Sequence, residues 1–230
     1  MLDTGDALIG GGFVGDRTQG EAIVAGMNLM GYDAMALGSK ELSLGPEVLQ
    51  QRMAEARFPM LSANVVFSDT GELLARPYTV LEVGSHRLGV IGLTRLPATA
   101  LVSFRVLDPQ QAAAQYVPRV AGQADVVILL TNLEYRAGLA LVRAVPGIDL
   151  LITALPGQLP SQAVRVPETG TVVVTAEQPL TRHTGRRVGR LVVTVERDGT
   201  LIGESWTSVV MYNKIADDPQ MKALLDCYRP

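Results

Sequence analysis

Apolar residues recur at two different spacings along the chain, and these spacings predict helices and strands that alternate. Residues three or four positions apart form helical stripes, whereas short runs of branched aliphatic residues are typical of strands buried on both faces. The predicted helices cover residues 20–30, 45–56, 108–124, 135–148 and 217–228. The predicted strands cover residues 34–38, 59–66, 125–131, 149–155 and 171–177.

Two further segments alternate apolar and polar residues on either side of a turn, which predicts β-hairpins. The first covers residues 78–94 around Gly84-Ser85, and the second covers residues 187–210 around Asp198-Gly199. Helix-strand units followed by hairpins indicate an α/β fold in which two sheets pack together with helices outside. The absence of a repeat or a long linker favours a single domain over residues 1–230.

Composition and charge exclude several classes of function. The net charge is -3, and no segment gathers Lys and Arg densely enough to neutralise a row of phosphates, so we expect no nucleic-acid partner. The single cysteine, Cys227, excludes an internal disulfide and a Cys-rich zinc site. No apolar run approaches the roughly 20 residues that cross a bilayer, so no membrane span is expected, and no secretory signal is visible in this chain.

Several segments, in order along nearly the whole chain, resemble the catalytic domain of the calcineurin-like metallophosphoesterases, in their 5'-nucleotidase branch of UDP-sugar hydrolase type. LDTGDALIGG (residues 2–11) is similar to the family's Gly-Asp segment, and GYDAMALGSKELSLG (31–45) to its Gly-Asn-His-Glu segment. FPMLSANVV (58–66) is similar to the family's Ser-Ala-Asn-Val strand. The match continues through residues 77–94, 124–138, 145–158, 184–195 and 215–225.

The resemblance implies a four-layer α/β/β/α sandwich with a two-metal site at the strand ends. In such a site two divalent cations, about 3.5–4 Å apart, hold a bridging hydroxide and polarise the phosphoryl oxygens. A dense cluster of carboxylate and imidazole ligands is needed to hold them. The function implied is hydrolysis of a phosphoric ester, on the condition that the ligands are present.

Position by position, most of the family's ligands are changed in this sequence. Asp6 stands at the position of the metal-bridging aspartate. Ser39 stands where the family has a metal-binding Asn, and Lys40 where it has the His that stabilises the transition state or leaving group. Asn132 replaces a later His ligand. The family's Asp-x-His pair lies on an earlier strand, which this chain does not include.

The last two imidazoles of the family's Gly-Gly-His-x-His segment fall on Leu155 and Gly157, which have no side-chain ligand atom. Glu41 and Asn64 match the pocket wall of the family. Together with Asp6, Ser39, Lys40 and Asn132, these residues form the vestigial pocket of the resemblance. We assign no catalytic residue and predict no cofactor; the alternative is two divalent cations such as Mn or Zn.

Structural roles compete with functional roles at several of these residues. Asp6 either survives as a ligand or ties down the glycine-rich turn, and we favour the second role because its partners are missing. Lys40 is either a weak substitute for a metal's charge near a phosphate or a solvated replacement. Glu41 and Asn64 are either remnants of the pocket wall or acceptors and donors for nearby backbone groups.

Neither histidine falls on a ligand position of the family. His86 lies beside the first hairpin turn, where we expect an exposed residue. His183 lies in a loop with Arg182, Arg186 and Arg187, and this basic patch either meets a nucleotide or acidic partner or is simply solvated.

Two hypotheses for function follow. In the first, the domain is a degenerate 5'-nucleotidase-like pseudoenzyme that acts as a non-catalytic scaffold or binding module. In the second, it is a divergent metal-dependent phosphoesterase that an upstream segment or a partner chain completes, with Asp6, Glu41 and Asn132 among its ligands.

The missing first strand of the family leads to an expectation about partners. A sheet without that strand has an open position whose unpaired backbone groups accept a strand. We therefore expect a homo-oligomer or protein partner at this position, or a rearranged N-terminus that fills it. The resemblance also implies an extracytoplasmic or periplasmic location in bacteria.

Overall fold

Strands that are apolar on both faces form the centre of the molecule. The computed structural model describes residues 1–97, 101–155, 162–175, 187–211 and 215–228. Its largest sheet has the strand order β10-β11-β9-β8-β6-β5, in which β6, β8, β9 and β11 run parallel and the two outer strands run antiparallel to their neighbours. These strands are β5 (Tyr78–Val83), β6 (His86–Leu93), β8 (Val126–Glu134), β9 (Leu150–Leu155), β10 (Val164–Arg165) and β11 (Val172–Thr175).

A second, smaller sheet packs against one face of the first. It consists of the parallel strands β1 (Leu2–Asp3), β2 (Ala34–Ala36) and β3 (Met60–Leu61). Alternation along β8 explains how the central sheet contacts two layers at once. Ile128 and Leu130 pack with Ala36 and Leu61 between the sheets, whereas Leu129 faces the helices on the other side.

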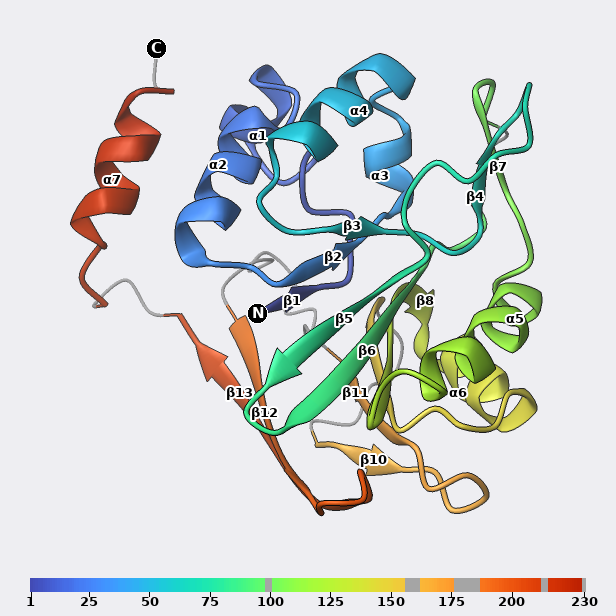
Figure 1. The fold of residues 1–230 in the computed structure, drawn as a ribbon. Helices are drawn as coiled ribbons and strands as arrows, with labels where there is room; N and C mark the ends of the chain where they lie inside the picture. The colour runs from blue at the N-terminus through green and yellow to red at the C-terminus, as the bar shows by residue number, and fades with distance from the viewer. Residues whose placement is uncertain (98–100, 156–161, 176–186, 212–214, 229–230) are drawn as a thin grey trace.

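Helices cover the outer face of each sheet, which completes a four-layer α/β/β/α sandwich (Figure 1). α2 (Glu21–Met30) and α4 (Pro46–Glu55) cover the small sheet, together with the short helices α1 (Phe13–Arg17) and α3 (Ser39–Leu42). α5 (Pro109–Ala121) and α6 (Tyr135–Ala144) lie side by side over the central sheet. The fold class predicted from the sequence is therefore confirmed.

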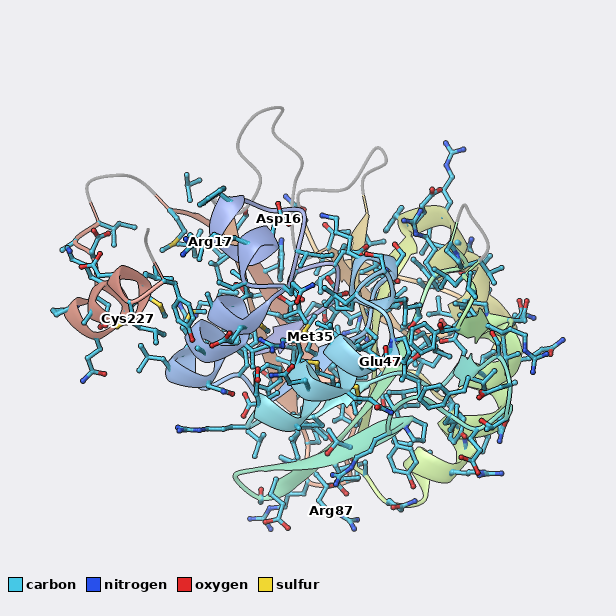
Figure 2. The ribbon with its side chains drawn as sticks, turned by 90° about the horizontal axis from the view of Figure 1, so that it is seen from above. Asp16, Arg17, Met35, Glu47, Arg87 and Cys227 are labelled. Carbon is cyan, nitrogen blue, oxygen red and sulfur yellow. The ribbon has the colours of Figure 1, made fainter. Side chains whose placement is uncertain are left out.

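Two antiparallel pairs and a last helix lie at the periphery. β4 (Val65–Phe67) pairs with β7 (Phe104–Val106), and β12 (Arg187–Val195) pairs with β13 (Leu201–Val210) around the predicted turn, where Gly199 has a φ of 91°. α7 (Pro219–Asp226) packs beside α2, and Asp218 caps its first turn. Figure 2 shows Cys227 at the end of this outlying helix and the buried Met35 within the body of the molecule.

The predicted strand at 59–66 is divided in the structure. β3 ends at Leu61, and the backbone between β3 and β4 bonds to other segments, with the N–H of Ser62 donating to Arg76 and that of Ala63 to Gly92. The sequence pattern did not predict this division, because the apolar residues on both sides continue one run. His86 is also half-buried at the start of β6 rather than exposed.

Within the described residues, β1 pairs with β2 alone and the β12–β13 hairpin pairs with no third strand. Whether a partner supplies a strand at such an edge stays a prediction. Among the described helices, none has the length and apolar character required to cross a bilayer.

The two sheets approach closely at Gly92 of β6. A Cβ added there would lie 2.5 Å from both the Cβ and the carbonyl oxygen of Leu61. Because backbone atoms cannot move aside easily, Gly92→Ala should lower the free energy of unfolding by about 1–3 kcal/mol in urea denaturation followed by circular dichroism. Gly203→Ala is the matched control, since its nearest atoms, in Thr194, are 3.8 Å away. Equal unfolding midpoints for the two variants would contradict this account of the sheet packing.

Candidate functional site

The ends of three strands bring the sequence-predicted residues together. Asp6 follows β1, Ser39 and Lys40 follow β2, and Asn132 lies near the end of β8. The Oδ1 atom of Asp6 accepts hydrogen bonds from the N–H of Lys40 at 2.8 Å and the hydroxyl of Ser39 at 3.3 Å. Its Oδ2 atom accepts one from the side-chain amide of Asn132 at 3.1 Å. Both oxygens of Asp6 thus bind donors from neighbouring strands.

The local backbone is shaped to permit this arrangement. Asp6 has a φ of 61°, in the left-handed region that Asp tolerates better than most residues. Gly38 is required because a Cβ there would lie 2.3 Å from the Oδ1 atom of Asp6. The turns after β1 and β2 therefore touch without room for a side chain between them.

The side chain of Glu41 links these two turns by hydrogen bonds to the backbone of both. Its side chain is 0% exposed, and it accepts hydrogen bonds from the N–H groups of Asp6 and Gly38, both at 2.8 Å, and Leu8 at 2.9 Å. Burial raises the pKa of the Glu41 carboxyl; the N–H of Leu8 opposes this rise and the negative charge of Asp6 adds to it. Glu41 thus satisfies backbone donors and has no free face toward a ligand.

The orientation of Asn132 is fixed by its second hydrogen bond. The N–H of Arg95, which follows β6, donates to the Oδ1 atom of Asn132 at 2.8 Å. The NH₂ group of Asn132 must therefore be the end that faces Asp6, because the opposite orientation would set two donors against each other. Asn132 offers Asp6 a donor, and its oxygen is turned away from the site.

Asn64 bonds mainly to backbone groups, with one longer hydrogen bond from the hydroxyl of Ser62 at 3.4 Å. Its Oδ1 atom accepts from the N–H of Thr94 at 2.8 Å, and its Nδ2 atom donates to the carbonyls of Thr94 at 2.8 Å and Leu107 at 2.9 Å. The Thr94 hydroxyl in turn donates to the Leu37 carbonyl at 2.8 Å. Asn64 and Thr94 thus hold the end of β6 against its neighbours.

Thr94 and Arg95 were not recognised as site residues from the sequence. Their position directly after β6, the parallel neighbour of β8, places them beside Asn132. The pairing of β6 with β8 would have indicated these two residues. The hairpin pattern of residues 78–94, however, predicts only the pairing of β6 with β5. The parallel pairing on its other side depends on tertiary packing, which the pattern does not contain.

The structure describes some of the remaining predicted residues, whereas others lie outside the described part of the chain. A Cβ added to Gly10 would lie 3.1 Å from the Nζ atom of Lys40, so the Lys40 ammonium rests against the glycine-rich segment. Leu155 ends β9, paired with Glu134 of β8. Gly157 and His183 lie outside the described residues, as do Arg182 and Arg186. His86 begins β6 at the end of the strand opposite Thr94.

The described side chains around Asp6 do not by themselves form a ligand set for a pair of divalent cations. Such ions require several anionic or imidazole ligands with free lone pairs. In the part of the chain that the structure describes, no group of three or more His, Cys, Asp or Glu side chains gathers in a way that suits a metal. Hydrogen-bond donors from Lys40, Ser39 and Asn132 instead contact both oxygens of the Asp6 carboxylate.

Comparisons with known proteins give several relatives named 5'-nucleotidase. The chain is 34% identical over 152 residues to the 5'-nucleotidase of Vibrio cholerae, covering 61% of this chain and 27% of that protein. The crystal structure of a 5'-nucleotidase precursor from Thermus thermophilus superposes with a TM-score of 0.85 at 30% identity, over 99% of this chain and 48% of that one.

A third similarity extends to a chain of more comparable length. The calcineurin-like phosphoesterase YfkN from Bacillus subtilis superposes with a TM-score of 0.75 at 21% identity, over 99% of this chain and 81% of that one, and supports the fold. The present chain spans about a quarter of the Vibrio relative and about half of the Thermus structure. No protein-family model matches the chain.

The buried Glu41 carboxylate should be necessary for stability. Glu41→Gln places an NH₂ group against backbone N–H donors, and we expect it to lower the free energy of unfolding by about 2 kcal/mol, the cost of unsatisfied buried donors. Urea unfolding measures this loss. Glu47→Gln, on the exposed face of α4 (Figure 2), is the matched control and should leave stability unchanged. An unaltered midpoint for Glu41→Gln would show that these hydrogen bonds do not hold the turns.

Asp3 should make stability depend on pH. Burial raises the pKa of its carboxyl from 3.8 to about 6; the N–H of Gly5 opposes the rise and the charge of Asp6 adds to it. Tyr32 also faces Asp3, whose charge contributes to a raised pKa of the phenol. Because the folded state holds the Asp3 proton more tightly than the unfolded chain, this stabilisation is complete below the unfolded pKa and is lost as pH rises through about 6.

We therefore expect the urea midpoint to fall between pH 4.5 and pH 7, and Asp3→Asn to reduce that fall. Asp217→Asn, at an exposed carboxyl, should leave the slope unchanged. If Asp3→Asn and the parent chain show the same slope, Asp3 is not the titrating group.

Proposed function

We infer that this chain belongs to the 5'-nucleotidase branch of the calcineurin-like phosphoesterases, and we propose that it keeps the family's architecture as a non-catalytic scaffold or binding module. On this proposal Ser39, Lys40, Asn132, Leu155 and Gly157 replace the family's ligands. Replacing imidazoles with aliphatic, glycine and cationic residues removes the lone pairs that hold divalent ions. The fold-forming segments around these positions are retained.

The observation that carries the proposal is the set of contacts made by Asp6. The carboxylate of a metal-bridging aspartate must offer lone pairs to cations. Here the N–H of Lys40, the hydroxyl of Ser39 and the amide of Asn132 use both oxygens of Asp6. These donors neutralise part of its charge by charge-assisted hydrogen bonds, so the carboxylate is stable in its site without an ion.

A second function is favoured by a different observation. Asp6, Ser39 and Asn132, distant in the sequence, meet at one point, as ligands of a divergent phosphoesterase would. On this alternative, an upstream segment or partner chain supplies the remaining ligands for two divalent cations such as Mn or Zn. The relatives named 5'-nucleotidase support it. The outward-turned oxygen of Asn132 counts against it.

Location and partners complete the proposal. We propose an extracytoplasmic, bacterial setting, as the family resemblance implies. We also propose that a protein partner or a second copy of the chain contacts the sheet edge at β1 or the β12–β13 hairpin. A scaffold of this kind acts through such a contact rather than through turnover.

Metal analysis together with hydrolysis assays tests the proposed function. We expect the purified chain, after incubation with Mn²⁺ or Zn²⁺ and desalting, to retain substoichiometric metal by inductively coupled plasma mass spectrometry. It should hydrolyse bis-nitrophenyl phosphate, AMP and UDP-glucose no faster than its Asp6→Asn variant, because that variant removes the only carboxylate of the site that matches a family ligand.

A full-length relative with 5'-nucleotidase activity, treated in parallel, confirms that the loading and assay conditions are adequate. Retention of two metal equivalents, with hydrolysis that Asp6→Asn abolishes, would overturn the non-catalytic proposal in favour of the phosphoesterase. An Asp-x-His strand encoded upstream of Met1 would give that alternative its missing ligands.

A further inference from the structure

A pocket separate from the Asp6 cluster lies on the helical side of the central sheet. Its volume is about 410 Å³, and it lies between the first turns of α5 and α6, beside the segment that follows β6. The carboxyl ends of parallel strands are where α/β sheets most often bind ligands. The described residues that line it are Arg95, Leu96, Asp108, Pro109, Gln110, Leu133, Glu134, Ala137, Ala140 and Leu141.

The walls of this pocket are mainly apolar. Leu96, Leu133 and Leu141 supply branched side chains, and Ala137 and Ala140 on α6 leave space because their side chains are single methyl groups. Such a surface gains free energy by burying an aryl or branched-aliphatic group of similar size. The body of a ligand for this pocket is therefore apolar.

Arg95 gives the pocket one cationic group that lacks a partner. Its Nε atom is buried and has no hydrogen-bond partner, and among the described residues its guanidinium forms no ion pair. A desolvated N–H without an acceptor is costly, and a carboxylate matches the planar fork of a guanidinium. The hydrogen bond from the Arg95 backbone to Asn132 fixes the position of this residue at the pocket.

The acidic residues of the lining limit the charge of the ligand. Asp108 caps α5 through a hydrogen bond from the N–H of Gln111 at 2.8 Å, and Glu134 is exposed at the start of α6. With one guanidinium and two carboxylates at the lining, a dianionic phosphate monoester would meet more repulsion than a carboxylate with a single charge. Between these two anions the charge pattern favours the carboxylate, provided that its charge lies against the guanidinium of Arg95 and away from Asp108 and Glu134.

We propose that this pocket binds a small monocarboxylate with an aryl or branched-aliphatic body, held by Arg95 at its carboxylate and by the facing walls of α5 and α6 at its body. The site does not depend on metal or on the proposed function, because none of its lining residues belongs to the Asp6 cluster. The pocket adjoins that cluster through the hydrogen bond from Arg95 to Asn132 and through Leu133, which follows Asn132 in the chain.

Ligand-observed saturation-transfer NMR on the full chain tests this site. The probes are 3-phenylpropionate and 4-methylpentanoate, compared with their neutral amides and with phenyl phosphate. We expect both acids to bind at least tenfold more tightly than their amides and more tightly than phenyl phosphate. Chemical-shift changes in ¹³C-methyl alanine spectra should centre on Ala137 and Ala140, which reports the place of binding independently of affinity.

Variants separate the charge from the pocket. Arg95→Gln should weaken binding of the acids at least tenfold. Arg136→Gln, at a residue of α6 that does not line the pocket, should not change binding. Ala137→Leu fills the pocket from an exposed helix position and should also abolish binding, which keeps the test decisive if Arg95→Gln fails to fold.

Three outcomes would overturn the proposal. They are equal binding of acids and amides, tighter binding of phenyl phosphate than of the acids, and no detectable binding of either acid up to its solubility limit. Each result contradicts either the role of Arg95 or the existence of the site, whatever the metal content of the protein.

Discussion

The Glu41 carboxylate is the group on which the geometry of this face depends. It lies without solvent exposure between the turns that follow β1 and β2, and its hydrogen bonds to Asp6, Leu8 and Gly38 use N–H groups that no regular structure satisfies. A buried carboxylate raises the electrostatic cost of the folded state, yet three buried donors without an acceptor would cost more. The two turns consequently behave as one unit.

The two turns held by Glu41 fix the position of Asp6. Hydrogen bonds then connect Asp6 to residues at the ends of neighbouring strands. Asp6 accepts from Asn132, Asn132 accepts from Arg95, and the adjacent Thr94 is bound by Asn64. The series connects the turn after β1 with the ends of β8 and β6. Polar residues at strand ends can therefore persist for structural reasons where a family elsewhere uses them for chemistry.

The sequence predicted the layers well because they follow from local periodicity. The continuous apolar run of β8 and the helical stripes of α2, α5 and α6 are visible in the chain itself. Short elements such as α1, α3 and the β4–β7 pair were not predicted, since only tertiary contacts stabilise segments of three to five residues.

The sequence predicted several residues of the candidate site, but it did not predict how their side chains are oriented. The family resemblance selected Asp6, Ser39 and Asn132, and the structure brings them together. Which end of the Asn132 amide faces Asp6 depends on the N–H of Arg95, a residue that follows a different strand. A one-dimensional pattern contains no information on that pairing, so an Asn that is suitable as an oxygen ligand in the sequence is a donor in the fold.

Charge compensation explains how a carboxylate can stay at such a position when ions do not hold it. An isolated Asp at converging strand ends would be costly, and either bound cations or hydrogen-bond donors can offset that cost. Here a backbone N–H, a hydroxyl and an amide supply the compensating dipoles, and each comes from a segment that the fold already places there. On the proposed function, the architecture does not require a metal centre, because short-range hydrogen bonds hold Asp6 where the strand ends meet.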